Sequence, residues 1–466
     1  MKLSLEKFLV FKHHLHMFFQ LDDYPFETKI FYPTVDLNAL LDQYPADQMQ
    51  TIYATIAFFE GFKYCLVFPE TYDVSAIAGD LPEAVTQAFS DWFPKAWSQH
   101  LYENERFDYK GPKIISSQAY KDRVQPCVIN TKSDKVLACN GGGKDSFVMM
   151  EMLEKASFDY DSYQFGRTEY GKLCTQQHLM DINCTLLKPS QTHHVNVYDD
   201  FTDGIFCTTY FPDIKGDSAT GNPCQVGTPE GIFETIPVCL AHSIRYVATG
   251  NEKSADEGSL YSQDLGHQVN HQWIKSLEAE TCFKDLISEN LVSDLEYFSL
   301  LKPIHDTRIY DFFAGRKDML PFIHSCNIEK PWCKKCPKCA YVWSNFVAIF
   351  DYDSVFDVFH VNLLDDPDLT LSFRQLLGLE NRNAFECVGE IHETRLAFKA
   401  MYEKGVSGHA MDIFVAEVLN QQDESYWHRI YEQYMAIDQD NHNIPHDLFD
   451  RIYGDKVAVS SIMKKA

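Results

Sequence analysis

The chain has 466 residues, of which 45% are hydrophobic and 14% aromatic, and its formal net charge is −26. This length predicts two or three packed units, and the apolar share excludes a disordered chain. The negative charge would repel a phosphate backbone, which argues against a nucleic-acid partner, although a small anion can still enter a local pocket.

The amino-terminal run Met1–Val10 has charges within its apolar residues and no small-residue cleavage site, so it does not resemble a signal peptide. We find no run of about 18 apolar residues that would span a membrane. We therefore expect a cytoplasmic protein without a membrane partner. Its 14 cysteines should then be thiols or metal ligands and not a disulfide framework.

Residues 1–125 are predicted to form an α+β accessory domain. Strand-like apolar runs occur at Lys29–Tyr32, Thr51–Phe59 and Phe62–Phe68, and a pattern with helical spacing follows Pro82. This unit shows no catalytic or binding motif, and we expect its aromatic side chains to pack in a core.

Residues 130–350 alternate short apolar strands with helices, which predicts an α/β unit with a parallel sheet and crossover helices. Val136–Asn140 is the first predicted strand, and Tyr163–Gly166 and Arg245–Thr249 are later ones. Ligands bind beyond the carboxyl ends of such strands, so the residues that follow each strand are the candidates for a site.

The first of these strands leads into three glycines and the sequence Lys-Asp-Ser. A glycine backbone can turn sharply and present several N–H donors to an oxyanion, and the next helix adds its positive end. We expect that helix over Phe147–Lys155, with Ser146 as its cap. The pattern predicts a nucleotide-phosphate loop that consists of Gly141, Gly142, Gly143, Lys144, Asp145 and Ser146.

Two better-known phosphate loops do not fit this run. A Walker loop would need Gly at Ala138 and Ser or Thr at Asp145, and a dinucleotide fingerprint would need a third Gly at Ser146. The run resembles the Ser-Gly-Gly-x-Asp-Ser loop of the N-type ATP pyrophosphatases, or PP-loop enzymes, although Gly141 stands where that family usually has Ser. That resemblance implies binding of ATP and cleavage between its α- and β-phosphates. The alternative is a glycine-rich turn without a ligand.

A second polar loop follows the strand that ends near Thr249, and we expect it to lie beside the first loop. Pyrophosphate release needs a divalent cation, and Mg²⁺ favours one or two carboxylates together with phosphate oxygens and water. The candidate ligands are Asp145, Glu252 and Asp256, of which Asp145 and Asp256 are the predicted Mg²⁺ pair; the alternative is a solvated loop. Gly250 and Asn251 are predicted to contact the nucleotide.

The segment His267–Glu280 is predicted to be a helix that carries His267 and His271 on one face. This spacing can bind zinc, but Gln268 stands where a metalloprotease helix has Glu, so a substrate cleft or plain packing is the favoured interpretation. Lys302 and Arg308 could then reach an anionic substrate or form a solvated basic pair.

Four cysteines lie within a short segment near the end of this unit, and they can close a tetrahedral thiolate site. Structural zinc is the first interpretation, an iron–sulfur cluster the second, and four unmetallated thiols the third. The predicted ligands are Cys326, Cys333, Cys336 and Cys339.

Residues 351–466 are predicted to be mainly helical, with amphipathic stretches at Phe373–Leu379, Glu393–Tyr402 and Gly408–Asn420.

These motifs together resemble the ATP-dependent UDP-MurNAc-L-alanyl-L-glutamate epimerases of peptidoglycan synthesis, the MurL type. The resemblance is carried by the runs at 141–146, 250–256, 270–280, 332–339 and 386–389, which include Trp332-Cys-x2-Cys-Pro-Lys-Cys339 and Glu386-Cys-Val-Gly389. It implies a PP-loop core with ATP, Mg²⁺ and a structural Zn²⁺, and a small-molecule substrate, the UDP-linked muropeptide precursor.

The resemblance also implies a reaction. The α-carboxylate of the terminal L-Glu attacks ATP, an acyl-adenylate and pyrophosphate form, and inversion followed by hydrolysis gives D-Glu and AMP. The sequence does not identify the base; His267 is one candidate, and the residues predicted to act in catalysis are Lys144, Asp145, Glu252, Lys253 and His271. The alternatives are another PP-loop enzyme that amidates or modifies a carboxylate or nucleobase, similar to the deazaguanine synthases, and a non-catalytic nucleotide-binding protein.

Overall fold

The computed structural model describes residues 1–122, 125–167, 172–201, 209–211, 229–329 and 331–454. In these residues a ten-stranded sheet has the order β12-β9-β6-β7-β8-β3-β2-β1-β4-β5, and β10 and β11 form a separate hairpin. The strands are β1 Lys2–Val10, β2 His14–Leu21, β3 Tyr24–Phe31, β4 Thr71–Asp73, β5 Lys113–Ile115, β6 Val136–Asn140, β7 Tyr160–Arg167, β8 Thr192–Asp199, β9 Tyr246–Thr249, β10 Leu260–Ser262, β11 His267–Val269 and β12 Glu296–Ser299.

The sheet is parallel from β12 through β9, β6 and β7 to β8, and antiparallel from β8 through β3 and β2 to β1. The predicted α/β class and the three predicted strands, which are now β6, β7 and β9, are confirmed. β3 pairs with β8, so residues before and after position 125 share one sheet. The boundary between an accessory domain and a central domain stays a prediction.

Helices cover both faces of the parallel strands. Along β6 the side chains of Val136 and Ala138 join one buried core, and the intervening Leu137 joins the other. Alternate residues of a strand point to opposite faces, so these two cores lie on the two sides of the sheet. The helices that precede residue 300 are α1 Leu37–Gln43, α2 Ala46–Lys63, α3 Glu83–Ala96, α4 Ser98–Glu103, α5 Lys144–Lys155, α6 Leu173–Leu186, α8 Glu230–Phe233, α9 Ile236–His242 and α10 Leu277–Asn290.

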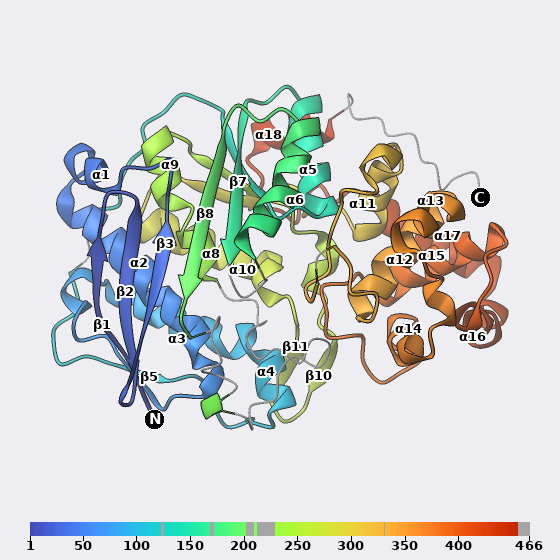
Figure 1. Cartoon of the computed structure of the whole chain (residues 1–466), viewed down its shortest axis with the longest axis horizontal. Coiled ribbons are helices and arrows are strands. Elements are labelled where there is room, and N and C mark those ends of the chain that lie inside the picture. The colour runs from blue at the N-terminus through green and yellow to red at the C-terminus, as the bar shows by residue number, and fades with distance from the viewer. Residues whose placement is uncertain (123–124, 168–171, 202–208, 212–228, 330, 455–466) are drawn as a thin grey trace.

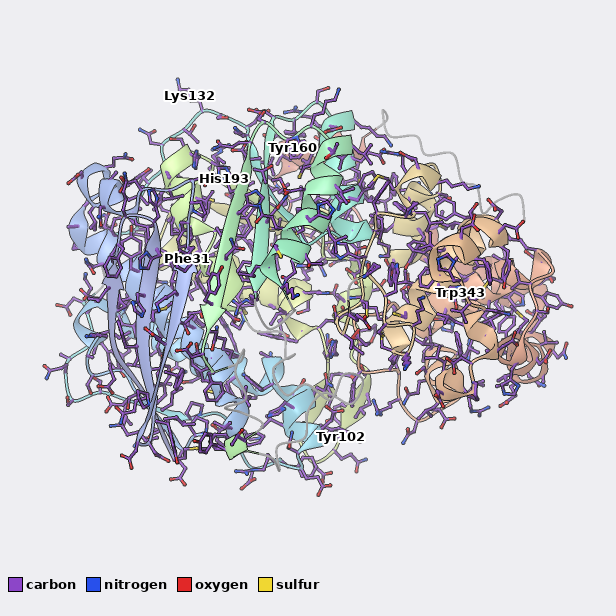
Figure 2. All side chains as sticks on the ribbon, viewed as in Figure 1. Phe31, Tyr102, Lys132, Tyr160, His193 and Trp343 are labelled. Atoms are coloured by element: carbon purple, nitrogen blue, oxygen red, sulfur yellow. The ribbon has the colours of Figure 1, made fainter. Side chains whose placement is uncertain are left out.

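The later helices gather mostly at one end of the molecule, opposite β1 to β3 (Figure 1). Trp343, labelled in Figure 2, is buried among them. These helices are α11 Asp306–Phe313, α12 Pro337–Ile349, α13 Tyr352–Phe359, α14 Thr370–Leu376, α15 Ile391–Glu403, α16 His409–Glu417, α17 Glu424–Met435 and α18 His446–Tyr453. None of the helices in the described parts of the chain is long and apolar enough to cross a bilayer.

Two predicted strands in the first 125 residues are wrong. Thr51–Phe59 lies within helix α2, and Phe62–Phe68 covers the end of that helix and a short 3₁₀ turn. Every residue of α2 from Thr51 to Lys63 is buried, so the helix has no polar face to give its sequence a helical period. A helix of this kind has the same continuous apolar pattern as a buried strand. The helix predicted after Pro82 is confirmed as α3.

The helix predicted over His267–Glu280 is also wrong in its first half. His267 lies on β11, and α10 begins only at Leu277, where the Ser276 side chain caps it. The side chain of Asn270 accepts the N–H of Gln272 at 2.9 Å and turns the chain between them. His267 and His271 therefore do not share a helix face.

Candidate functional site

The predicted phosphate loop joins β6 to α5. Helix α5 begins at Lys144 with Gly143 as its N-cap, one turn earlier than the sequence predicts, so Ser146 lies inside the helix and does not cap it. The Ser146 hydroxyl instead accepts the N–H of Gly141 at 3.0 Å, and the side chain of Asn140 accepts the N–H of Gly142 at 2.9 Å. The loop thus folds onto the start of the helix, where backbone N–H groups favour an anion.

Gly142 has a φ of +78° and lies against His324, whose side chain is 2% exposed. A Cβ atom at position 142 would come 2.3 Å from His324 Nε2. Both the backbone conformation and the close packing therefore require glycine here.

We expect Gly142→Ala to lower the melting temperature and to weaken the predicted ATP binding. Gly266→Ala is the matched control, because Gly266 has a φ of +79° and a Cβ added there would meet nothing within 4 Å. Both variants carry the left-handed strain of roughly 1 kcal/mol or more, and only Gly142→Ala adds overpacking of about 1–3 kcal/mol. Calorimetry and nucleotide titration of the two variants measure this difference, and equal melting temperatures would contradict the predicted contact.

Lys144 is buried and forms ion pairs with Asp145 and Asp306, while its ammonium lies 4.6 Å from the centre of the Tyr310 ring. Burial alone would lower the pKa of Lys144, but the two carboxylates outweigh it and raise the pKa, which keeps the ammonium charged. Burial raises the pKa of Asp306, and Lys144 opposes that shift. Asp306 was not predicted as a site residue.

The second predicted loop lies against the first, as the sequence predicts. β9 pairs with β6, and a Cβ atom at Gly250 would lie 3.1 Å from the backbone carbon of Asp145. The N–H of Asp306 donates to the Ser254 hydroxyl at 3.1 Å, so one residue is hydrogen bonded to both loops. The side chain of Asn251 donates to Thr249 Oγ1 at 3.1 Å.

The charged residues of the second loop have different surroundings. Glu252 is buried, and Lys253 forms an ion pair with Asp438 of the carboxyl-terminal region. Asp256 accepts the N–H of Leu277 at 2.7 Å. The carboxylate of Asp256 is therefore engaged with the start of α10, and the Mg²⁺ pair of Asp145 and Asp256 stays a prediction.

Lys302 is fully buried, and its ammonium donates to the backbone carbonyls of Glu252 and Lys275, each at 2.8 Å, and to Asp256 at 3.1 Å. Its hydrogen bonds fasten the second loop from inside the fold. This position does not fit the predicted contact with an anionic substrate.

A cavity of about 450 Å³ opens at the carboxyl ends of β6 and β9 and is also lined by side chains of β7 and β12. This volume lies within the range of small-molecule sites. In the described residues the buried hydroxyl of Tyr163 has no hydrogen-bond partner, and a ligand in the cavity could supply one. The residues that line this cavity include Asn140, Gly141, Tyr163, Asn251, Lys275 and His324.

The four predicted metal ligands form one cluster. Their sulfur atoms lie within 4.8 Å of one another, with 4.0 Å between Cys326 and Cys336 and 3.8 Å between Cys333 and Cys339. Zn–S bonds of about 2.3 Å in a tetrahedron place two sulfurs about 3.8 Å apart. The donor set and its spacing fit one metal ion, whereas an iron–sulfur cluster binds its thiolates through separate iron atoms and spreads them further.

Sequence reasoning assigned no role to a third group beside the cavity. Lys275 lines the cavity; burial alone would lower the pKa of its ammonium, but Cys387, Glu252 and Asp145 outweigh burial and raise it. Lys275 and Cys387 stand inside two of the runs that carried the family resemblance, which was the available signal. His271 was predicted to act in catalysis, and its ring also hydrogen bonds to Gln99.

The parallel sheet and the cavity at its carboxyl edge define an α/β protein with a small-molecule site. The family description "MurL N-terminal domain" matches residues 233–300, and "MurL C-terminal domain" matches residues 322–432. The chain belongs to the MurL epimerase family and is an isomerase.

Three relatives named UDP-N-acetyl-alpha-D-muramoyl-L-alanyl-L-glutamate epimerase are similar to this chain. The protein of a Micromonospora species is 32% identical over 70% of this chain and 69% of its own length, and that of Salinispora tropica is 31% identical over 68% and 65%. The Xanthomonas oryzae protein is 26% identical over 87% and 85%. No solved structure matches this chain.

Proposed function

We propose that this chain uses ATP to invert the terminal L-glutamate of UDP-MurNAc-L-Ala-L-Glu, and so supplies a D-glutamate precursor for peptidoglycan. The printed activity of the relatives supports the epimerisation. The observation that carries the use of ATP is a glycine loop whose Gly141 lines a ligand-sized cavity and which leads directly into the ion pair of Lys144 and Asp145 at the start of α5.

Activation explains why an epimerase would consume ATP. The negative charge of a free α-carboxylate opposes removal of the adjacent α-proton. Attack of this carboxylate on the α-phosphate forms an acyl-adenylate and releases pyrophosphate, which removes the charge. The carbonyl can then delocalise the electron pair of the C–H bond, and hydrolysis after inversion gives D-Glu and AMP.

The residues of the two loops suggest how the nucleotide would bind in a PP-loop-like core. Because the N–H groups of Gly141 and Gly142 already donate to Ser146 and Asn140, the N–H groups at the start of α5 together with Lys144 would hold the β,γ-pyrophosphate, and Asn251 would lie beside it. Mg²⁺, when bound at Asp145 with Asp256 as the predicted partner, would neutralise charge on the departing pyrophosphate. The four cysteines would hold a structural Zn²⁺.

Incubation with UDP-MurNAc-L-Ala-L-Glu, ATP and Mg²⁺ in D₂O tests this proposal. We expect AMP, pyrophosphate, D-Glu in the product and deuterium at its α-carbon. ATP with a methylene bridge between its β- and γ-phosphates should still support the reaction, whereas a bridge between α and β should block it. Chiral analysis after acid hydrolysis and mass spectrometry provide the readouts.

Other outcomes would contradict the proposal in different ways. If AMP forms but the glutamate stays L and unlabelled, the proposed activation is correct and the proposed epimerisation is wrong. AMP that forms only with ammonia and another acid would favour an amidating enzyme of the deazaguanine-synthase kind. Inversion without ATP would reject the nucleotide assignment.

A further inference from the structure

Lys275 is the last residue of the short 3₁₀ turn Trp273–Lys275, which comes just before α10. Its N–H donates to the carbonyl of Gln272 at 2.8 Å, and its own carbonyl accepts the buried ammonium of Lys302 at 2.8 Å. The next residue, Ser276, caps α10. The backbone of Lys275 is therefore held on both sides, while its half-buried side chain lines the large cavity.

The wall of the large cavity is mostly uncharged. Among the described residues that line it there is no aspartate or glutamate, and Lys275 is the only lysine or arginine. The rest of the wall combines polar side chains such as Asn251 with apolar and aromatic ones such as Phe165, Ile274 and Tyr297. In a chain with a net charge of −26, a wall of this composition favours a ligand that brings an anionic group to Lys275.

Four other cations on the elements around the cavity have carboxylate partners within the protein. These ion pairs join Lys144 to Asp145 and Asp306, Arg167 to Glu230 and Glu234, Lys253 to Asp438, and Lys302 to Asp256. In contrast, no carboxylate in the described part of the chain forms an ion pair with Lys275. An anionic ligand group in the cavity would give this ammonium the counter-charge that the other four already have.

The proposed reaction brings phosphates and carboxylates into this region. The phosphates of ATP would be held by the start of α5, Lys144 and Mg²⁺. The α-carboxylate of the terminal glutamate loses its charge when it is adenylated. The γ-carboxylate keeps its charge through every step, and its burial in a mostly uncharged cavity is costly unless a cation pairs with it. It is therefore the group that most needs a permanent cation.

We propose that Lys275 binds the γ-carboxylate of the substrate's terminal glutamate and makes the site specific for glutamate. This inference rests on the proposed function. The glutamyl end would then lie in the same cavity as Gly141 and Asn251, which belong to the two predicted nucleotide loops. The ion pair would also reduce the negative charge close to the α-carbon, where the carbanion forms.

A comparison of two substrates tests the proposal. They are UDP-MurNAc-L-Ala-L-Glu and its L-Gln counterpart, in which an uncharged amide of similar size replaces the γ-carboxylate. We expect the native protein to prefer the glutamate substrate by on the order of 100-fold in kcat/KM for the exchange of labelled pyrophosphate into ATP, because the amide cannot form a charge-assisted hydrogen bond with the ammonium.

The Lys275 variants should remove this preference. In Lys275→Met and Lys275→Gln it should fall to within a few-fold, because only the glutamate substrate loses a partner. Activity toward the glutamine substrate and the KM for ATP should stay within a few-fold of the native values, which also shows that the variants are folded. Lys275→Arg keeps the charge and should retain a preference of about 10-fold or more.

Lys284→Met is the matched control. Lys284 is another half-buried lysine, lies on α10 and is ion paired with Glu296. This variant should keep the preference, the exchange rate and the KM for ATP. A preference that persists in both neutral Lys275 variants, with activity toward the two substrates lowered equally, overturns the inference, since Lys275 would then act on ATP or on the fold. So does a native protein that uses both substrates equally well.

A binding measurement separates failure of this inference from failure of the proposed function. Calorimetric titration of the two UDP-linked peptides, with ATP that carries a methylene bridge between its α- and β-phosphates, measures the preference without a reaction. If the native protein exchanges no pyrophosphate but prefers the glutamate peptide in binding, and the neutral Lys275 variants do not, the activation is rejected and the role of Lys275 is supported. Equal binding of both peptides, or binding of neither, overturns the inference whatever the exchange assay shows.

Discussion

Asp145→Asn is expected to reduce substrate-dependent exchange of labelled pyrophosphate into ATP by on the order of 100-fold or more, because a carboxylate that binds Mg²⁺ contributes several kcal/mol to the stabilisation of the departing phosphates. The fold should survive, since Lys144 keeps its buried ion pair with Asp306 when Asp145 is neutralised. Asp145 is also the less buried of these two carboxylates, with 33% of its side chain exposed against 4%. Loss of exchange without loss of stability is the signature of this role.

Asp318→Asn is the matched control. Asp318 is ion paired with Arg316 and 56% exposed, and it lies outside both predicted nucleotide loops. Exchange and melting temperature should both stay near their native values in this variant. If the Asp145→Asn protein exchanges pyrophosphate at the native rate, the Asp145 carboxylate has no role in activation. One that unfolds would show that Asp306 alone does not stabilise the buried ammonium.

The meeting of the two predicted nucleotide loops, at 141–146 and 250–256, could be predicted from sequence because it follows from topology. Parallel strands end at one edge of a sheet, and β6 and β9 are neighbours, so their loops had to meet. The cysteine cluster could also be predicted from sequence, since its four members lie close together in the chain. Both predictions depend on short-range patterns and on a general rule of sheet geometry.

The packing of the loop before α15 against the segment before α10 could not be predicted in this way. Gln272 and Val388 are more than a hundred positions apart, and the hydrogen bond between them forms only because these two segments pack together. The sequence interpretation also placed His271 on a helix that the structure does not contain, so its hydrogen bond to Gln99 could not be predicted. Helix α2 was predicted as strands for a related reason. Its complete burial removes the helical period of apolar and polar residues from which a helix is predicted.

The cysteine cluster is connected to the phosphate loop through the chain that precedes it. His324, two residues before Cys326, packs on Gly142, and its N–H faces the Gly142 carbonyl at 3.4 Å. On the other side, Cys336 is the N-cap of α12, which is buried along most of its length. A metal ion bound by the four thiolates would therefore fix both the wall of the phosphate loop and the start of a central helix.

Cys336→Ser should remove about one zinc per chain from anaerobically purified protein and lower the melting temperature, because metal-binding energy in such sites is also folding energy. Serine retains a side-chain acceptor for the N–H of Cys339 and is a good N-cap, so the substitution separates metal loss from cap loss. Pyrophosphate exchange should fall as well, because His324 loses its anchor. Cys174→Ser, at an exposed cysteine, should keep zinc, stability and exchange. Elemental analysis and calorimetry measure these outcomes. Iron together with sulfide in the protein would show that the cysteines bind an iron–sulfur cluster and not zinc. A native melting temperature in protein without metal would show that the site has no structural role.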